Sequence, residues 1–144
     1  MSLLLESNYY AFGFYVALNA LIMLVLSMLV VRARVATQTN IGDGGKPEMA
    51  GPLRAHANNT EYVPMALLLL WALASVPPGG SIWLIHGVGG TLTIGRIIHS
   101  IGLTSSTGPG GLRFIGMIFT WIAFIAGIVG VFWLVFFAAN GSAT

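Results

Sequence analysis

Four polar side chains stand at helical spacing where a long apolar segment begins. They are Arg54, Asn58, Glu61 and Tyr62, and the apolar run from Val63 follows at once. At about 100° per residue, positions i, i+4, i+7 and i+8 share an arc of roughly 100°. One helix face therefore carries a cation, an amide, an anion and a phenol. His56 points nearly the opposite way, so we expect it to serve a neighbouring helix or subunit.

The composition predicts a membrane protein. Of the 144 residues, 56% are hydrophobic and only 7% are charged, and the mean hydropathy is +0.87. A water-soluble globule of this length needs more polar surface. The chain has no cysteine, which excludes disulfides, thiolate metal sites and a cysteine nucleophile. No basic cluster with interleaved aromatic residues indicates a nucleic-acid partner.

The apolar segments predict an all-α, four-helix transmembrane bundle formed by a single domain, residues 1–144. A spanning helix needs about 20 apolar residues. The expected spans cover about 9–35, 52–76, 81–104 and 111–139. The loop from Thr37 to Pro52 and the turn Pro77-Pro78-Gly79-Gly80 separate the first three. We expect Asn19 to hydrogen-bond to another helix, and the glycines of the third span to allow close helix packing.

All six Lys and Arg residues fall toward one membrane face on this path: Arg32, Arg34, Lys46, Arg54, Arg96 and Arg113. The positive-inside rule makes that face cytoplasmic. Both termini are then expected outside the cytoplasm. An ionisable group inside a membrane segment is costly, and by default it indicates a functional site.

Polar residues of three helices are expected to meet at one depth. Arg96 and His99 lie on the third span and Arg113 opens the fourth. Together with the face that contains Glu61, they form a cationic pocket with one carboxylate. Arginine binds carboxylates bidentately and Glu accepts from an ammonium group. Glutathione, with two carboxylates, one ammonium group and a thiol, fits that pattern. No residue set suggests a metal site.

The same residues resemble a known family. The segment Arg54-Ala-His-Ala-Asn58-Asn-Thr-Glu61-Tyr62, followed by Pro64, is similar to the second-helix signature of the MAPEG family, the membrane-associated proteins in eicosanoid and glutathione metabolism. Gly95-Arg96-x-x-His99 and Arg113 before a long apolar helix extend the resemblance over essentially the whole chain. It implies a homotrimer of four-helix protomers with glutathione, the co-substrate, held between subunits at the cytoplasmic side.

The resemblance also implies a role for each site residue. Arg113 would be catalytic and stabilise the thiolate, while the other positions would bind glutathione: Arg54, Asn58, Glu61, Tyr62, His99, and from an adjacent protomer Arg34 and His56. Family members that form eicosanoids commonly have tyrosines where this chain has His99 and Leu103. That departure favours the bacterial branch and a location in the bacterial inner membrane.

Simpler structural roles remain open for several of these residues. Arg54 and Glu61 could form an ion pair that only pins helices, and Asn58 could satisfy backbone groups freed near Pro64. Tyr62 could anchor at the membrane interface. Arg34 could be an orientation signal, Arg96 could reach the headgroups, and His99 could hydrogen-bond to another helix: the sequence admits both roles in each case.

The expected function is conjugation of glutathione to lipophilic electrophiles by a membrane glutathione transferase, with reduction of lipid hydroperoxides as a second use of the same thiolate. The alternative is a non-catalytic protein on the same fold that binds membrane lipid or acts as a scaffold. A small multidrug exporter is a third hypothesis. Such exporters place an essential carboxylate within the first span, whereas here Glu6 precedes that span and Glu61 lies in the second.

Overall fold

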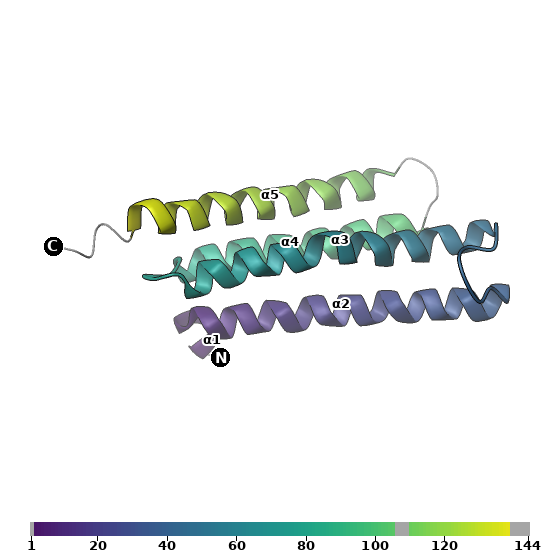
Figure 1. Cartoon of the computed structure of the whole chain (residues 1–144), viewed down its shortest axis with the longest axis horizontal. Coiled ribbons are helices and arrows are strands. Elements are labelled where there is room, and N and C mark those ends of the chain that lie inside the picture. The colour runs from purple at the N-terminus through teal and green to yellow at the C-terminus, as the bar shows by residue number, and fades with distance from the viewer. Residues whose placement is uncertain (1, 106–109, 139–144) are drawn as a thin grey trace.

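The computed structural model describes residues 2–105 and 110–138, and these residues are almost entirely helical. Figure 1 shows the elements in chain order, which are α1 (Ser2–Glu6), α2 (Asn8–Thr37), α3 (Pro47–Ser75), α4 (Ile82–Ser105), α5 (Gly111–Trp133) and a terminal π-helical turn, η1 (Leu134–Ala138). The long helices correspond to the four segments expected from the sequence. Residue 139, the last of the expected fourth span, and residues 106–109, between the third and fourth spans, lie outside the described residues.

The four long helices run antiparallel in sequence order. In Figure 1, α3 and α4 lie between α2 and α5, with α3 nearer the viewer. Helix α4 packs mainly against α5, and α2 packs against both α3 and α4. The end of α2, the start of α3, the end of α4 and the start of α5 therefore share one end of the bundle. All six Lys and Arg residues belong to this half, which we call the basic end.

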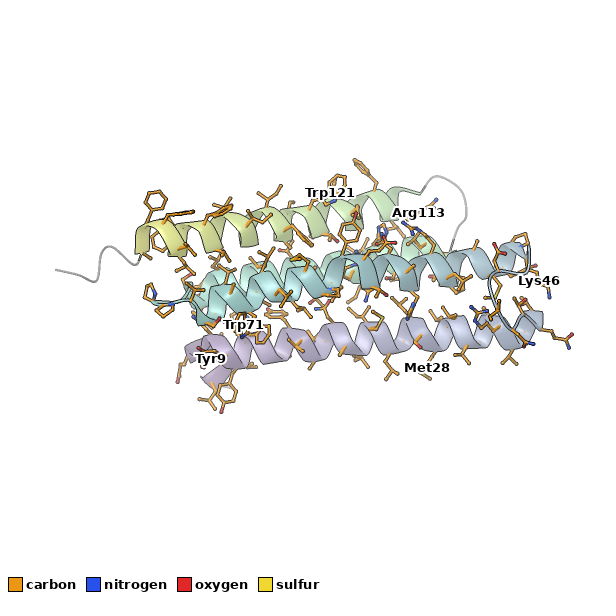
Figure 2. All side chains as sticks on the ribbon, viewed as in Figure 1. Tyr9, Met28, Lys46, Trp71, Arg113 and Trp121 are labelled. Carbon is orange, nitrogen blue, oxygen red and sulfur yellow. The ribbon has the colours of Figure 1, made fainter. Side chains whose placement is uncertain are left out.

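Within the described residues, two helical segments are long and apolar enough to cross a membrane, Asn8–Thr37 and Gly111–Ala138. Helices α3 and α4 have 29 and 24 residues, which also suffices in length at about 1.5 Å per residue, but they contain the polar side chains of the cluster. Large apolar side chains cover the outside of the bundle. Met28 and Trp121, for example, are 63% and 51% exposed and point away from it (Figure 2).

Helix α3 begins five residues before the expected start. Pro47 occupies its first turn after Lys46 in an extended conformation, which is where proline suits a helix because its missing N–H would have no partner there. Glu48 adds a negative charge to the same turn, and this favours the positive end of the helix dipole. Pro52, expected to mark the beginning of the helix, instead lies inside it.

Glycine allows α4 and α5 to approach closely. A Cβ built at Gly116 would lie 2.4 Å from the backbone nitrogen of His99, and one at Gly95 would lie 2.9 Å from the carbonyl oxygen of Gly116. Neither position has room for a side chain. The predicted packing role is confirmed for Gly95, and for Gly89, where a Cβ would lie 2.3 Å from the Tyr15 ring, but Gly87 faces open space. The Gly95–Gly116 contact fixes the register of α5 against α4 beside the polar cluster.

The predicted interhelical bond of Asn19 is also confirmed. Asn19 is buried in α2, and its Nδ2 donates to Thr93 Oγ1 of α4 over 3.0 Å and to the Tyr15 carbonyl over 2.9 Å. Farther toward the N-terminal end of the bundle, the Tyr15 hydroxyl and His86 Nδ1 are 3.0 Å apart. His86 Nε2 also lies 2.8 Å from the Leu4 carbonyl oxygen. These contacts tie α1, α2 and α4 together.

Candidate functional site

The polar face of α3 forms a connected set of side chains. Arg54 Nη1 donates to Glu61 Oε1 over 3.0 Å, two helical turns away. Asn58 lies between them, and its Nδ2 is 3.5 Å from Glu61 Oε2. The Arg54 and Glu61 side chains are 59% and 47% exposed in the single chain. The pair is therefore open on one side, where a ligand or a second copy can reach it.

Arg96 completes this set from inside the bundle. It is fully buried, and its Nη2 donates to Asn58 Oδ1 over 2.8 Å. Asn58 thus uses its oxygen for a cation on α4 and its nitrogen for the carboxylate on α3. The proposal that Arg96 reaches the headgroups does not hold, because its guanidinium lies between helices. The Asn58 side chain hydrogen-bonds to two other side chains, and among the described residues it makes no hydrogen bond to the backbone near Pro64.

The buried guanidinium of Arg96 retains unused donors. Its Nε and Nη1 are buried and have no hydrogen-bond partner among the described residues. Its central carbon lies 5.8 Å from the centre of the Tyr62 ring, within the range of a cation–π contact. Tyr62 in turn meets Phe124 of α5 edge to face at 6.1 Å. Tyr62 therefore packs inside the bundle and stabilises the position of Arg96.

His99 and Arg113 connect α4 to the beginning of α5. His99 is buried, and its Nδ1 lies 2.8 Å from the Arg113 carbonyl oxygen. This contact realises the hydrogen bond to another helix that the sequence left open for His99. A Cβ at Gly102 would lie 2.9 Å from Arg113 Cγ, so glycine there makes room for the Arg113 side chain. Figure 2 shows Arg113 at the beginning of α5, toward the same end of the bundle as Lys46.

His99 lies in a region of positive charge. His99 lies within electrostatic range of Arg96, Arg113 and Arg54, and Arg96 lies within range of Glu61. The structure therefore gathers basic side chains of α3, α4 and α5 at one end of the bundle, and two of them, Arg54 and Arg96, act on the carboxylate of Glu61. This arrangement concentrates positive charge at the basic end of the bundle and suits an anionic ligand.

Comparison with known proteins identifies the family. The model of the MAPEG family matches residues 12–133, which include every residue of this cluster. The chain belongs to the MAPEG family. It is 33% identical to the inner membrane protein YecN of Escherichia coli K12 over 119 residues, covering 83% of this chain and 88% of YecN. YecN of Escherichia coli O6:H1 matches to the same extent. This MAPEG protein is therefore a membrane protein.

Two predicted ligand residues of this MAPEG protein have other contacts in the single chain. Arg34 Nη1 donates to the carbonyl oxygens of Thr39 and Gly42, over 3.3 and 3.1 Å, and so holds the loop between α2 and α3. His56 is half-buried, and its backbone carbonyl accepts a hydrogen bond from the Thr60 hydroxyl. Neither side chain contacts the Arg54–Glu61 pair, so a role in the same site would require an adjacent protomer.

Sequence reasoning counted Arg96 among the residues of the cationic pocket but did not include it among the glutathione-binding residues. The available signal was its spacing, because Arg96 and His99 stand at i and i+3 and must share a face of α4. No group of three His, Cys, Asp or Glu side chains in the described parts of the chain could hold a metal ion.

Proposed function

We propose that this MAPEG protein is a membrane glutathione transferase. The observation that carries the proposal is the connected array in which Arg54 pairs with Glu61 and Asn58 joins that pair to buried Arg96. An ion pair that served only to pin helices would not need a third, buried cation connected through an amide. The array supplies cations for carboxylates and one carboxylate for an ammonium group, which is the charge pattern of glutathione.

Binding would occur on the open side of the pair. The half-exposed guanidinium of Arg54 can take one glutathione carboxylate bidentately, while Glu61 accepts from the glutathione ammonium group. Arg96 is fully buried and acts through Asn58, so we assign it a positioning role. It holds the Asn58 amide in place beside Glu61.

Arg113 would activate the thiol. It lies in the first turn of α5, which begins at Gly111, and a helix N-terminus adds partial positive charge from its unpaired amides. A free thiol has a pKa near 8.5 and is only a few per cent ionised at pH 7. A guanidinium in a low-dielectric site favours the thiolate, and each unit of pKa lowering corresponds to about 1.4 kcal/mol.

The thiolate would attack substrates that partition into the bilayer. In conjugation, sulfur forms a bond to an electrophilic carbon, the leaving group departs with its electron pair, and the thiol proton has already passed to solvent. In peroxide reduction, sulfur attacks the terminal oxygen and the lipid alcohol leaves. A second glutathione then displaces hydroxide as water and yields the disulfide. One activated nucleophile would serve both reactions.

The working form would be a homotrimer. The charged side chains of Arg54 and Glu61 are about half exposed in the single chain, and leaving such groups to lipid is costly. A neighbouring copy would cover this face and could contribute Arg34 and His56 to the ligand. Native mass spectrometry should release complexes of three copies. A protein that remains monomeric in every mild detergent while it turns over glutathione would contradict this assembly.

The site would face the cytoplasm, where glutathione is made. The positive-inside rule places the basic end on that side and both termini on the other. YecN is named an inner membrane protein, which supports a bacterial inner membrane. A reporter fused to either terminus should be active only if it functions outside the cytoplasm.

A conjugation assay separates this function from the alternative. Purified protein in detergent is incubated with glutathione and a lipophilic aryl halide, and chloride release is measured beside a protein-free control. Glutathione-dependent turnover supports the transferase. Binding of a fatty acid without turnover of any electrophile would favour the lipid-binding or scaffold role instead.

A further inference from the structure

A groove lies between α2 and α4, away from the polar face of α3. Its walls are apolar and include Leu21, Val25 and Leu29 of α2 and Ile97 and Ile101 of α4, and its volume is about 270 Å³. At about 1.5 Å per residue, Leu21 to Leu29 spans about 12 Å. One leaflet of the hydrocarbon core is about 15 Å deep. The groove therefore matches the length available to one acyl chain in one leaflet.

The groove leads to an unpaired cation at the basic end. A second hollow shares Leu29 and Thr104 with it and is also lined by Arg32. On α2, Leu21, Leu29 and Arg32 fall within an arc of about 80°, so they follow one helix face. The Arg32 side chain is exposed, and it makes no recorded hydrogen bond or ion pair with the described residues. Glu48 lines a separate hollow beside Pro52.

The groove also contains a buried hydroxyl that lacks a partner. Ser100 is only 6% exposed and lines the groove. Its Oγ has no hydrogen-bond partner among the described residues. Helical serines usually bond to the carbonyl four residues earlier, and buried hydroxyls in general are paired. An acceptor brought by a ligand, such as an ester oxygen, would satisfy this group.

We propose that the α2–α4 groove is a binding site for an anionic phospholipid of the inner leaflet. One acyl chain occupies the apolar walls, the phosphate group pairs with Arg32, and Ser100 donates to an ester oxygen. The charge of Arg32 and the single-leaflet length of the groove identify this occupant. The inference is independent of glutathione chemistry, because no groove residue belongs to the Arg54–Glu61–Arg96 cluster.

The position of the groove favours lipid over a second copy of the chain. The groove is formed by α2 and α4, so it opens on the α4 side of the bundle, which is the far side in Figure 1. The half-exposed charges that need cover belong to α3, on the near side. Arg34, the α2 residue that a neighbour would contribute, lies about 160° around the helix from Arg32. A neighbouring protomer is therefore expected on other faces, and the α2–α4 face is left to the bilayer.

Native mass spectrometry of the full-length protein tests the site. The solubilised protein is mixed with equal amounts of phosphatidylglycerol and phosphatidylcholine that carry identical acyl chains. One arginine near a membrane surface contributes about 1 kcal/mol toward anionic lipid, so we expect about five-fold preferential retention of phosphatidylglycerol. Arg32→Gln should remove the preference, and Arg32→Lys should retain it. Equal retention of both lipids by the wild type would overturn the proposal.

A matched pair of variants tests the apolar walls. Val25→Trp fills the groove and should remove both lipids, whereas Val31→Trp, at an exposed α2 position outside the groove, should leave them bound. Circular dichroism and the mass of the lipid-free complex establish that each variant is folded. If Val25→Trp leaves lipid retention unchanged, or changes the number of copies and not the lipid, the groove is not a lipid site. If it fails to fold, Arg32→Gln still decides.

Discussion

Arg96 and Asn58, on neighbouring helices, are joined by a 2.8 Å hydrogen bond that connects the interior of the bundle to its exposed charged face. Among the described residues, Asn58 is the only side chain that connects the Arg96 guanidinium to the Arg54–Glu61 pair by hydrogen bonds. The geometry of the proposed glutathione site should therefore depend on a buried residue, Arg96, that the ligand does not reach.

This relationship predicts coupling between Arg96 and Asn58. Arg96→Met removes the bond, leaves the Asn58 oxygen unpaired, and should weaken glutathione binding. Asn58→Ala should weaken binding too. The double variant should be little worse than either single change, because both changes remove the same hydrogen bond. A hydrogen bond to a charged group is worth about 1.5–3 kcal/mol. Isothermal titration of all four proteins gives the coupling energy. Additive losses would mean that the two residues act separately.

The Arg54–Glu61 pair should matter more for binding than for stability. Half-exposed ion pairs contribute about 0–1 kcal/mol, so Arg54→Gln and Glu61→Gln should each change the thermal midpoint only slightly. Each removes a charge that the ligand needs, and the dissociation constant for glutathione should rise about tenfold or more. The charge-swapped double variant should keep stability without restoring affinity. A large loss of stability with normal affinity would mean that the pair, whose two residues both belong to α3, has only a structural role.

Arg113 should affect turnover more than binding. In Arg113→Ala the pKa of the bound thiol rises toward about 8.5, so less thiolate is present at pH 7. We expect kcat to fall about ten- to hundredfold while the glutathione KM changes little. The deficit should shrink as the pH rises above the pKa of the free thiol, where ionisation no longer needs the guanidinium. Arg113→Lys should retain part of the activity.

A different result would reassign Arg113. If KM rises as much as kcat falls, or if the deficit is the same at all pH values, Arg113 positions glutathione and does not ionise its thiol. The Gly102 contact, in which the Arg113 stem passes beside α4, would then explain why the residue stands there.

Substitution of a glycine at the α4–α5 contact should lower the thermal stability, whereas substitution of a glycine outside that contact should not. Gly116→Ala places a methyl group against the backbone of His99 and Gly95, and overpacking of this kind costs about 1–3 kcal/mol. The shift would also displace Arg113. Gly87→Ala on α4 is the matched control, because its added Cβ meets nothing within 4 Å. Thermal unfolding in detergent should show a clear loss for the first variant and none for the second. Equal midpoints would show that the helix contact is looser than the structure indicates.

Much of the fold could be predicted because membrane helices follow from local properties of the sequence. Apolar length gave the positions of the helices, and Pro77-Pro78-Gly79-Gly80 marked a turn by backbone chemistry alone. The start of α3 was placed too late because proline can lie at the first turn or within a helix, and only packing decides between Pro47 and Pro52.

The site was predictable where its residues share one helix and less so across helices. Helical periodicity alone predicts that Arg54, Asn58 and Glu61 share one face. Periodicity could not distinguish a buried Arg96 from one that reaches the headgroups, because hydropathy does not report the direction of a side chain. The contacts of Arg34 with the loop carbonyls depend on the path of the chain between helices, which spacing does not define.

The most direct test of the central claim is the ultraviolet absorbance of the thiolate during titration of the wild-type protein with glutathione at neutral pH. S-methyl glutathione, which cannot ionise at sulfur, serves as the blank. The mechanism predicts a saturable thiolate signal that follows site occupancy and is strongly reduced in Arg113→Ala. Full occupancy by glutathione with no thiolate absorbance would contradict activation of the thiol by the arginines of this site.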